Sequence, residues 1–198
     1  MKFFVVDNGS RHLSKICDRL ADHEYETVTY TPFTVLDPGD ADMIILSGGM
    51  QNEVIAHHED GYPWYRHEFD LIRNTDKPIL GICLGLQMVT VALGGSLMRL
   101  PEFIDKQHKV VLNHQGQKLL NEPFVFVQEK HQWVASSIEK TGLHILAQSE
   151  DGIEILYHPA RRIIATQFHP EVDTNAHSEA IFWKFVDAVA RQKIGAVQ

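Results

Sequence analysis

One short segment, Lys77–Gln87, constrains most strongly what this chain can fold into. It contains a continuous apolar run, Ile79–Ile82, which is typical of a buried strand, and apolar residues at helical spacing follow this run. Between the predicted strand and the predicted helix, Gly81 and Gly85 flank Cys83. A strand, a tight turn that carries a nucleophile between small residues, and a helix form the geometry of a nucleophile elbow.

Such a turn would give Cys83 chemical reactivity. The flanking glycines allow a strained turn and a close approach of strand and helix, which lifts the sulfur above the edge of the sheet. The free N–H groups and the dipole at the start of the helix then favour the thiolate. The alternative is a structural cysteine, since a lone cysteine in an apolar run is often only part of the core.

Composition and charge narrow the class of protein. With 198 residues, the chain can form one sizeable α/β domain over residues 1–198, whereas two full domains would be cramped. The formal net charge of -8, from 26 acidic and 18 basic residues, argues against a nucleic-acid-binding surface. Cys17 and Cys83 show neither metal-ligand spacing nor a disulfide pattern, and we expect Cys17 in the core. We therefore expect neither a metal nor a cofactor.

Two observations bear on the compartment. No apolar run approaches the ~18–20 residues of a membrane span, so no membrane contact is expected. The apolar residues 1–6 are too few for a signal peptide, and Asp7 interrupts them. Together these features predict a reducing, cytoplasmic setting.

The order of predicted elements indicates an α/β fold with a mostly parallel central sheet flanked by helices. Strands and helices alternate up to residue 95, as in strands joined by crossover helices. Short extended segments then follow one another over residues 96–157, and we expect a small antiparallel sheet appended to the parallel core. The expected strands are residues 3–6, 24–30, 43–46, 79–82, 109–112, 124–128, 144–148, 154–157 and 162–167, and helices are expected to begin near residues 10, 63, 84 and 176.

A second loop at the same edge of the predicted sheet carries two glycines. Ser47, Gly48 and Gly49 directly follow the apolar strand at residues 43–46. Ligands of parallel sheets bind outside the carboxyl ends of the strands, so this loop and Cys83 should face one crevice. The glycine pair suggests a backbone that approaches a ligand closely, although an ordinary tight turn would have the same composition.

A base and its orienting partner follow the last predicted strand. A thiol nucleophile needs a base that holds the thiolate, and the base in turn needs an orienting group. His169 and Glu171 lie two residues apart just after residues 162–167, so their side chains can point to the same side. Pro170 between them keeps the segment extended. Both side chains can therefore meet Cys83 at one sheet edge.

Together, Gly81–Gln87 and Gln167–Glu171 resemble the class I (triad-type) glutamine amidotransferase family, and the similarity covers essentially the whole chain. The resemblance implies a flavodoxin-like fold and a thiol chemistry. In that chemistry Cys83 would attack the carboxamide of glutamine, forming a γ-glutamyl thioester and releasing ammonia. His169 would act first as base and then as acid, and Glu171 would orient it.

The resemblance also implies roles for four residues around the nucleophile. Backbone N–H groups of Gly49 and Leu84 would hold the oxyanion of the tetrahedral intermediate. Gly48 and Gln87 would contact the substrate. For Gln87 the alternative is a polar side chain that faces solvent.

Within the family, Leu46–Gly49 and Gln167–Val172 are most similar to the stand-alone glutaminase subunit of GMP synthetase. Three features depart from the family pattern. Leu86 stands where members commonly have His, Met50 stands where the GMP-type subunit has Pro, and Lys130–Trp133 replaces a segment that faces the synthetase. We expect these departures to affect the interface with an ammonia acceptor more than the thiol chemistry.

The resemblance implies L-glutamine as substrate and a separate synthase chain as partner, because the chain lacks a nucleotide-binding signature. Three alternatives stay open: a free-standing γ-glutamyl hydrolase, the glutaminase subunit of an anthranilate- or aminodeoxychorismate-type synthase, and a non-catalytic family member. The Ser47–Gly49 loop lacks the Pro-Gly-rich sequence that the second alternative more often carries. The intact Cys83, His169 and Glu171 count against the third.

Overall fold

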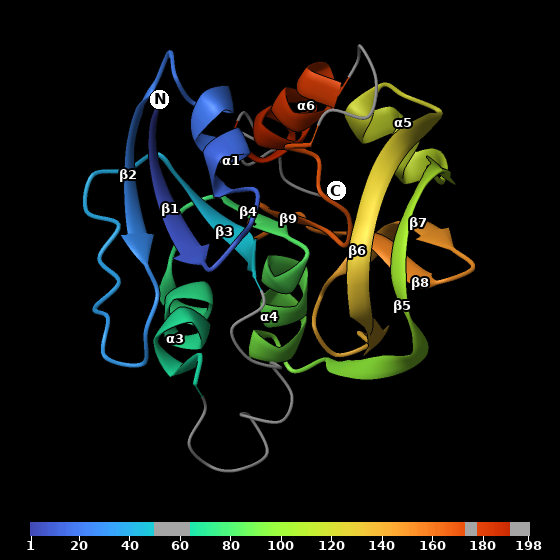
Figure 1. The fold of residues 1–198 in the computed structure, drawn as a ribbon, viewed down its shortest axis with the longest axis horizontal. Coiled ribbons are helices and arrows are strands. Elements are labelled where there is room, and N and C mark those ends of the chain that lie inside the picture. Colours follow the sequence, from blue (N-terminus) through green and yellow to red (C-terminus); the bar gives the residue numbers. More distant parts are fainter. Residues whose placement is uncertain (50–63, 173–177, 191–198) are drawn as a thin grey trace.

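The computed structural model describes residues 1–49, 64–172 and 178–190 (Figure 1). These residues form a seven-stranded sheet, a two-stranded sheet and helices that pack against them. The strands are β1 (Lys2–Asn8), β2 (Glu24–Thr29), β3 (Met43–Gly49), β4 (Ile79–Ile82), β5 (Ser96–Val111), β6 (Phe124–Ser137), β7 (His144–Ser149), β8 (Gly152–His158) and β9 (Ile163–Thr166). The helices are α1 (Leu13–Arg19), α3 (Arg66–Asn74), α4 (Leu84–Ala92), α5 (His114–Leu120) and α6 (Ser178–Ala190).

The central sheet has the strand order β2-β1-β3-β4-β9-β8-β7. Its first five strands in this order run parallel, β8 pairs antiparallel with β9, and β7 pairs antiparallel with β8. The prediction of a mostly parallel α/β fold with an appended antiparallel sheet is therefore confirmed. It is wrong in detail about residues 144–157, because β7 and β8 join the central sheet, while β5 and β6 alone form the second one.

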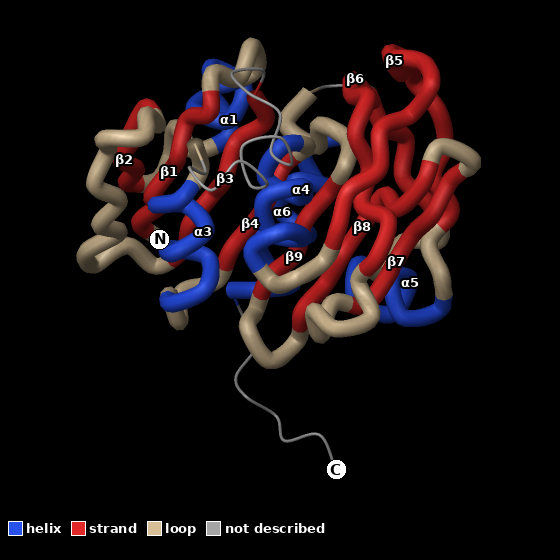
Figure 2. Tube along the Cα trace, turned by 90° about the horizontal axis from the view of Figure 1, so that it is seen from below, coloured by secondary structure: helices blue, strands red, loops and turns tan. Residues whose placement is uncertain are grey.

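Helices cover both faces of the central sheet. Figure 1 shows α1 and α6 on one side and α3 and α4 on the other, and Figure 2 shows the same layers from below. The alternation of side chains along β1 matches these layers, since Phe3 and Val5 belong to the core beneath α1 and α6, whereas Phe4 and Val6 belong to the core beneath α3 and α4. Within the described residues, no helix is long and apolar enough to cross a membrane.

Local details differ from the sequence-based expectations. Between the expected strands at residues 109–112 and 124–128, the chain forms helix α5, and the Asn113 side chain caps it by accepting a hydrogen bond from the N–H of Gly116 (2.9 Å). Cys17 is half-buried rather than part of the core. Two expected helix starts, near residues 63 and 176, lie outside the described residues.

Helix α4, which follows Cys83, is buried on all sides. It packs against α3, against the central sheet and against β5 and β6. Its approach to the sheet depends on Gly85, where a Cβ atom would lie 2.6 Å from the carbonyl oxygen of Leu46 and 3.0 Å from the Leu46 Cβ. Glycine is required here because no side chain fits between helix and strand.

We predict that Gly85→Ala destabilises the protein by about 1–3 kcal/mol, since the added methyl group would push α4 away from β3. Urea unfolding followed by far-UV circular dichroism measures this loss. An unfolding midpoint equal to that of the wild type would contradict the close packing of Gly85 on Leu46.

Candidate active site

The candidate site is centred on Cys83, which lies between β4 and α4. The φ angle of Cys83 is +51°, a left-handed conformation that non-glycine residues rarely adopt. On the strand side, a Cβ at Gly81 would lie 2.9 Å from the backbone of Gly85, so the two glycines let strand and helix meet closely. Backbone strain of this kind is typical of functional positions.

His169 and Glu171 follow β9 at the same edge of the sheet. Both are buried, and His169 Nδ1 lies 2.8 Å from Glu171 Oε1. The backbone N–H of His169 also donates a hydrogen bond to the carbonyl of Gln128 on β6 (3.0 Å). Glu171 thus orients the imidazole, and β6 holds the main chain of His169.

The charge state of His169 depends on its two neighbours. Burial by itself would lower the pKa of His169, but the negative charge of Glu171 and hydrogen bonds with Cys83 and Glu171 raise it to about 10. A protonated imidazole next to the sulfur of Cys83 favours the thiolate. The arrangement can therefore supply both a nucleophile and a proton donor.

The glycine loop at the end of β3 lies against these residues. A Cβ at Gly48 would lie 2.9 Å from His169 Cε1 and 3.6 Å from the Cβ of Cys83, and a Cβ at Gly49 would lie 2.1 Å from the carbonyl oxygen of Asn8. The loop is therefore compatible only with small residues. Leu84 is the first residue of α4, where N–H groups have no partner within the helix.

Gln87, one helical turn after the nucleophile, is buried, which excludes the solvent-facing alternative. Its Nε2 donates a hydrogen bond to the carbonyl of Trp133 on β6 (3.1 Å). Leu86 is fully buried in the core shared with α3, and Met50 lies outside the described residues.

Sequence reasoning missed the contribution of β6 to the site. Cys83 Sγ donates to the carbonyl of Lys130 (3.7 Å), and it accepts from Nε2 of the buried Gln167 (3.8 Å). The segment Lys130–Trp133, expected to affect an acceptor interface more than the thiol chemistry, therefore also borders the nucleophile through its main chain. A main-chain contact of this kind leaves no signal in the sequence.

His12 is a second residue that the sequence did not single out. It precedes α1, and its ring stacks edge-on against His169 with 4.9 Å between ring centroids. Burial and then the positive charge of His169 lower the pKa of His12. His12 is one of 12 histidines and belongs to no motif, so only the structure places it at the site.

A buried polar network supports the glycine loop from below. Ser47 Oγ accepts from the N–H of Asn8 (2.9 Å) and donates to the carbonyl of Gly48 (2.7 Å). The side chain of Asn8 donates to Glu68 Oε1 (3.1 Å), and Glu68 is fully buried on α3. Burial raises the pKa of Glu68 to about 8, against the opposing effect of the hydrogen bond from Asn8.

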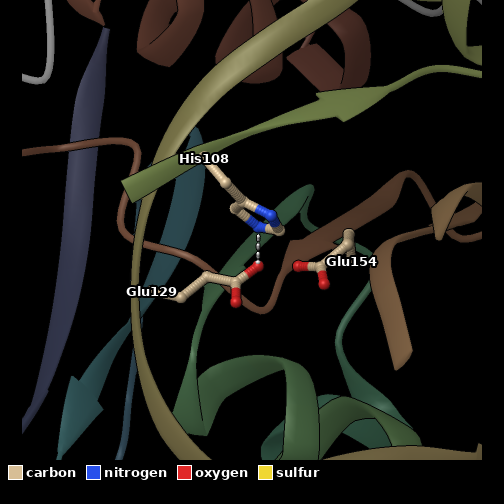
Figure 3. Close-up of side chains that lie close together, drawn as sticks. All are labelled: His108, Glu129 and Glu154. Carbon is tan, nitrogen blue, oxygen red and sulfur yellow. Dashed lines mark hydrogen bonds and ion pairs between the residues drawn. The ribbon is translucent and has the colours of Figure 1, made fainter. Parts of the chain in front are cut away.

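One further group of side chains has the composition of a metal site. His108, Glu129 and Glu154 place their ligand atoms within 4.8 Å of one another (Figure 3). This group lies outside the set of residues predicted from the sequence, which includes no metal ligand.

Comparison with known proteins bears on the chemistry of the site. A family model described as glutamine amidotransferase class-I matches residues 4–189. A relative from Picrophilus torridus, a subunit of a glutamine-hydrolyzing GMP synthase, is 28% identical over 198 residues, and the match covers 96% of this chain and 100% of the relative. A glutamine-hydrolyzing GMP synthase from Thermotoga petrophila is 27% identical over 195 residues, with 94% of this chain covered but only 36% of the relative.

A solved structure with a similar sequence also has a similar fold. The crystal structure of a protein assigned as a GMP synthase subunit in Thermoplasma acidophilum superimposes with a TM-score of 0.80 at 26% identity. The match covers 96% of this chain and 94% of that chain.

The first prediction from this geometry concerns the His169–Glu171 pair. The folded-state pKa of His169 (about 10) lies above its ordinary value of 6.5, so the pair stabilises the protein fully below about pH 6.5 and less as the pH rises towards 10. Glu171→Gln should cost about 3 kcal/mol at pH 6 and clearly less at pH 10. Urea unfolding at both pH values measures the difference. The exposed Glu139→Gln is the control, and an equal loss for Glu171→Gln at both pH values would contradict the prediction.

The second prediction concerns Glu68. Its folded-state pKa of about 8 lies above the ordinary value of 4.5. Between these pH values the carboxyl group ionises in the unfolded chain but keeps its proton in the native protein, so the free energy of unfolding falls as the pH rises from 4.5 to 8. Glu68→Gln cannot ionise, so it should match the wild type near pH 5 and exceed its stability by on the order of a few kcal/mol at pH 8. Urea unfolding at several pH values tests this, and a pH-independent difference would refute it.

Proposed function

The chain belongs to the class-I glutamine amidotransferase family, and on this basis we propose that it hydrolyses L-glutamine to glutamate and ammonia through Cys83, His169 and Glu171. The observation that carries the proposal is the buried His169–Glu171 pair beside a cysteine with a positive φ angle. A structural cysteine would need neither the strained turn nor the charged partner.

In the proposed reaction, the thiolate of Cys83 attacks the γ-carboxamide carbon, and the electron pair of the C=O bond moves to oxygen. The imidazolium of His169 gives its proton to the amide nitrogen as the C–N bond breaks, which releases ammonia and leaves a γ-glutamyl thioester. Neutral His169 then takes a proton from water. The resulting hydroxide attacks the thioester carbon, and the C–S bond breaks, which returns the thiolate of Cys83 and releases glutamate. Glu171 orients the ring in both steps.

We assign the oxyanion to the backbone N–H groups of Gly49 and Leu84, where the start of α4 adds the positive end of its dipole. We place Gly48 at the substrate, since it lies next to Cys83 and His169, where an added Cβ would be 2.9 Å from His169 Cε1. Gln87 is the second residue that we expect to contact the substrate, and its Nε2 also holds the main chain of β6 at Trp133.

The proposed acceptor of the ammonia is a separate synthase chain of the GMP synthase type. The match covers the full length of a relative that is a GMP synthase subunit and 36% of a longer GMP synthase. These names support the GMP-type partner over an anthranilate- or aminodeoxychorismate-type one. A thiolate nucleophile and a biosynthetic role fit the cytoplasm.

The test is the release of ammonia from glutamine by the purified chain. Cys83→Ala should lower the rate by at least about 1,000-fold, because it removes the nucleophile. The matched control is Cys17→Ala at the other cysteine, which should keep the wild-type rate. Covalent labelling of Cys83 by an electrophilic glutamine analogue tests the site if the isolated chain is slow.

Two further assays distinguish a synthase subunit from a free-standing hydrolase. One measures cleavage of a panel of γ-glutamyl amides, and the other adds the synthetase component of a GMP synthase. Stimulation by the synthetase supports the proposed partner. Cleavage of larger γ-glutamyl amides but not of glutamine would instead identify a free-standing hydrolase. Failure of labelling together with equal rates for Cys83→Ala and wild type would refute the triad.

A further inference from the structure

A compact group of titratable side chains lies apart from the three proposed catalytic side chains, where the two sheets meet. His108 comes from β5, Glu129 from β6 and Glu154 from β8, and all three point towards one another (Figure 3). Both carboxyl groups are buried, and the side chain of His108 is 20% exposed. The group is therefore close to solvent on one side only.

Existing contacts use only part of the bonding capacity of these groups. His108 Nε2 lies 2.6 Å from Glu129 Oε1, and Ser149 Oγ donates to Glu154 Oε1 (2.5 Å). The second oxygen atoms of Glu129 and Glu154, both inaccessible to solvent, have no hydrogen-bond partner among the described residues.

A second histidine points to a missing ligand. The side chain of His131 is 1% exposed, and neither of its ring nitrogens has a hydrogen-bond partner among the described residues. Its Nε2 lies 3.5 Å from Glu129 Oε2. His131 and Glu129 are two residues apart on β6, so both side chains point to the same face.

Two buried carboxyl groups in contact are unfavourable without a compensating charge. Lys106 is the cross-strand partner of Glu129, but its ammonium group is bound by Asp151 (2.6 Å) and Glu150 (3.1 Å). A divalent cation would neutralise both carboxylates.

We propose that His108, Glu129 and Glu154 bind one divalent transition-metal ion of the zinc class, with His131 as the fourth ligand. A donor set of two imidazoles and two carboxylates suits Zn²⁺ or Fe²⁺ better than Mg²⁺ or Ca²⁺, which prefer oxygen ligands alone. Ligands around a tetrahedral Zn²⁺ lie about 3.4 Å apart, given Zn–N and Zn–O distances of about 2.0–2.1 Å. The ligand atoms of the first three residues, all within 4.8 Å, need only side-chain rotations to reach this geometry.

The ion would fix the strand that borders the proposed nucleophile. On β6, the carbonyl of Gln128 accepts from the N–H of His169, and the carbonyl of Lys130 accepts from Cys83 Sγ. Glu129 lies between these two residues. A metal ion bound by both Glu129 and Glu154 would therefore connect this part of β6 to β8 of the central sheet. The proposed role is to position β6, and the ion takes no part in the hydrolysis itself.

The test uses the full chain without an affinity tag, stripped with EDTA and titrated with Zn²⁺ or Co²⁺. We expect about one metal ion per chain by elemental analysis after removal of excess metal, and the absorption of tetrahedral Co²⁺ in the visible range. Metal should raise the thermal unfolding midpoint by ~5–10 °C. Fewer than about 0.2 ions per chain with Zn²⁺, Co²⁺, Mn²⁺ and Fe²⁺ alike would overturn the proposal.

Variants identify the ligands independently of any glutaminase activity. His108→Gln and Glu154→Gln should each weaken metal binding by at least about 100-fold, whereas the metal-free Glu154→Gln chain should unfold at or above the midpoint of the metal-free wild type. The control, His144→Gln, removes an exposed histidine on β7 and should bind normally. Cys83→Ala should also keep its metal. Retention in both ligand variants, or loss in His144→Gln or Cys83→Ala, would place the metal elsewhere and refute the site.

Discussion

The close contact of backbone with backbone around Cys83 is the constraint on which the rest of the site depends. The carbonyl of Leu46 occupies the space that a side chain at residue 85 would need, and Asn8 does the same at Gly49. Strand, loop and helix are therefore locked together with no side chains between them. This rigidity allows Cys83 to keep a φ angle of +51°, since the local strain is small compared with the packing that maintains it.

Much of the parallel core could be predicted because β1, β3, β4 and β9, unlike the exposed edge strand β2, contain continuous apolar runs, a pattern that burial on both faces imposes. The second sheet could not be delimited in the same way. β5 begins at Ser96 and passes through Arg99 and Pro101, whose composition gives no strand signal, and pairing with β6 decides its length. The sheet that β7 and β8 join is likewise decided by tertiary packing, because the alternation of polar and apolar residues is the same for either sheet.

In the candidate site, too, some residues could be predicted from local sequence and others depend on tertiary packing. Residues that directly follow predicted strands, such as Gly48, Cys83 and His169, could be placed together because parallel strands end at one edge. His12 and Glu68 could not, since each is a common residue type on a helix or next to one, and only packing brings it to the site. The carboxyl groups of Glu129 and Glu154 meet across two sheets, and nothing in their sequence spacing indicates this.

The contacts of β6 with the site have a consequence for how such a protein can diverge. Gln128 and Lys130 meet His169 and Cys83 through carbonyl oxygens, which every amino acid possesses. Selection on the hydrolysis can therefore act on the path of this strand while leaving the identity of its outward side chains free to drift. At Lys130 and Gln132, whose side chains lie on the face of β6 opposite Glu129 and His131, the sequence can therefore change without altering these main-chain contacts.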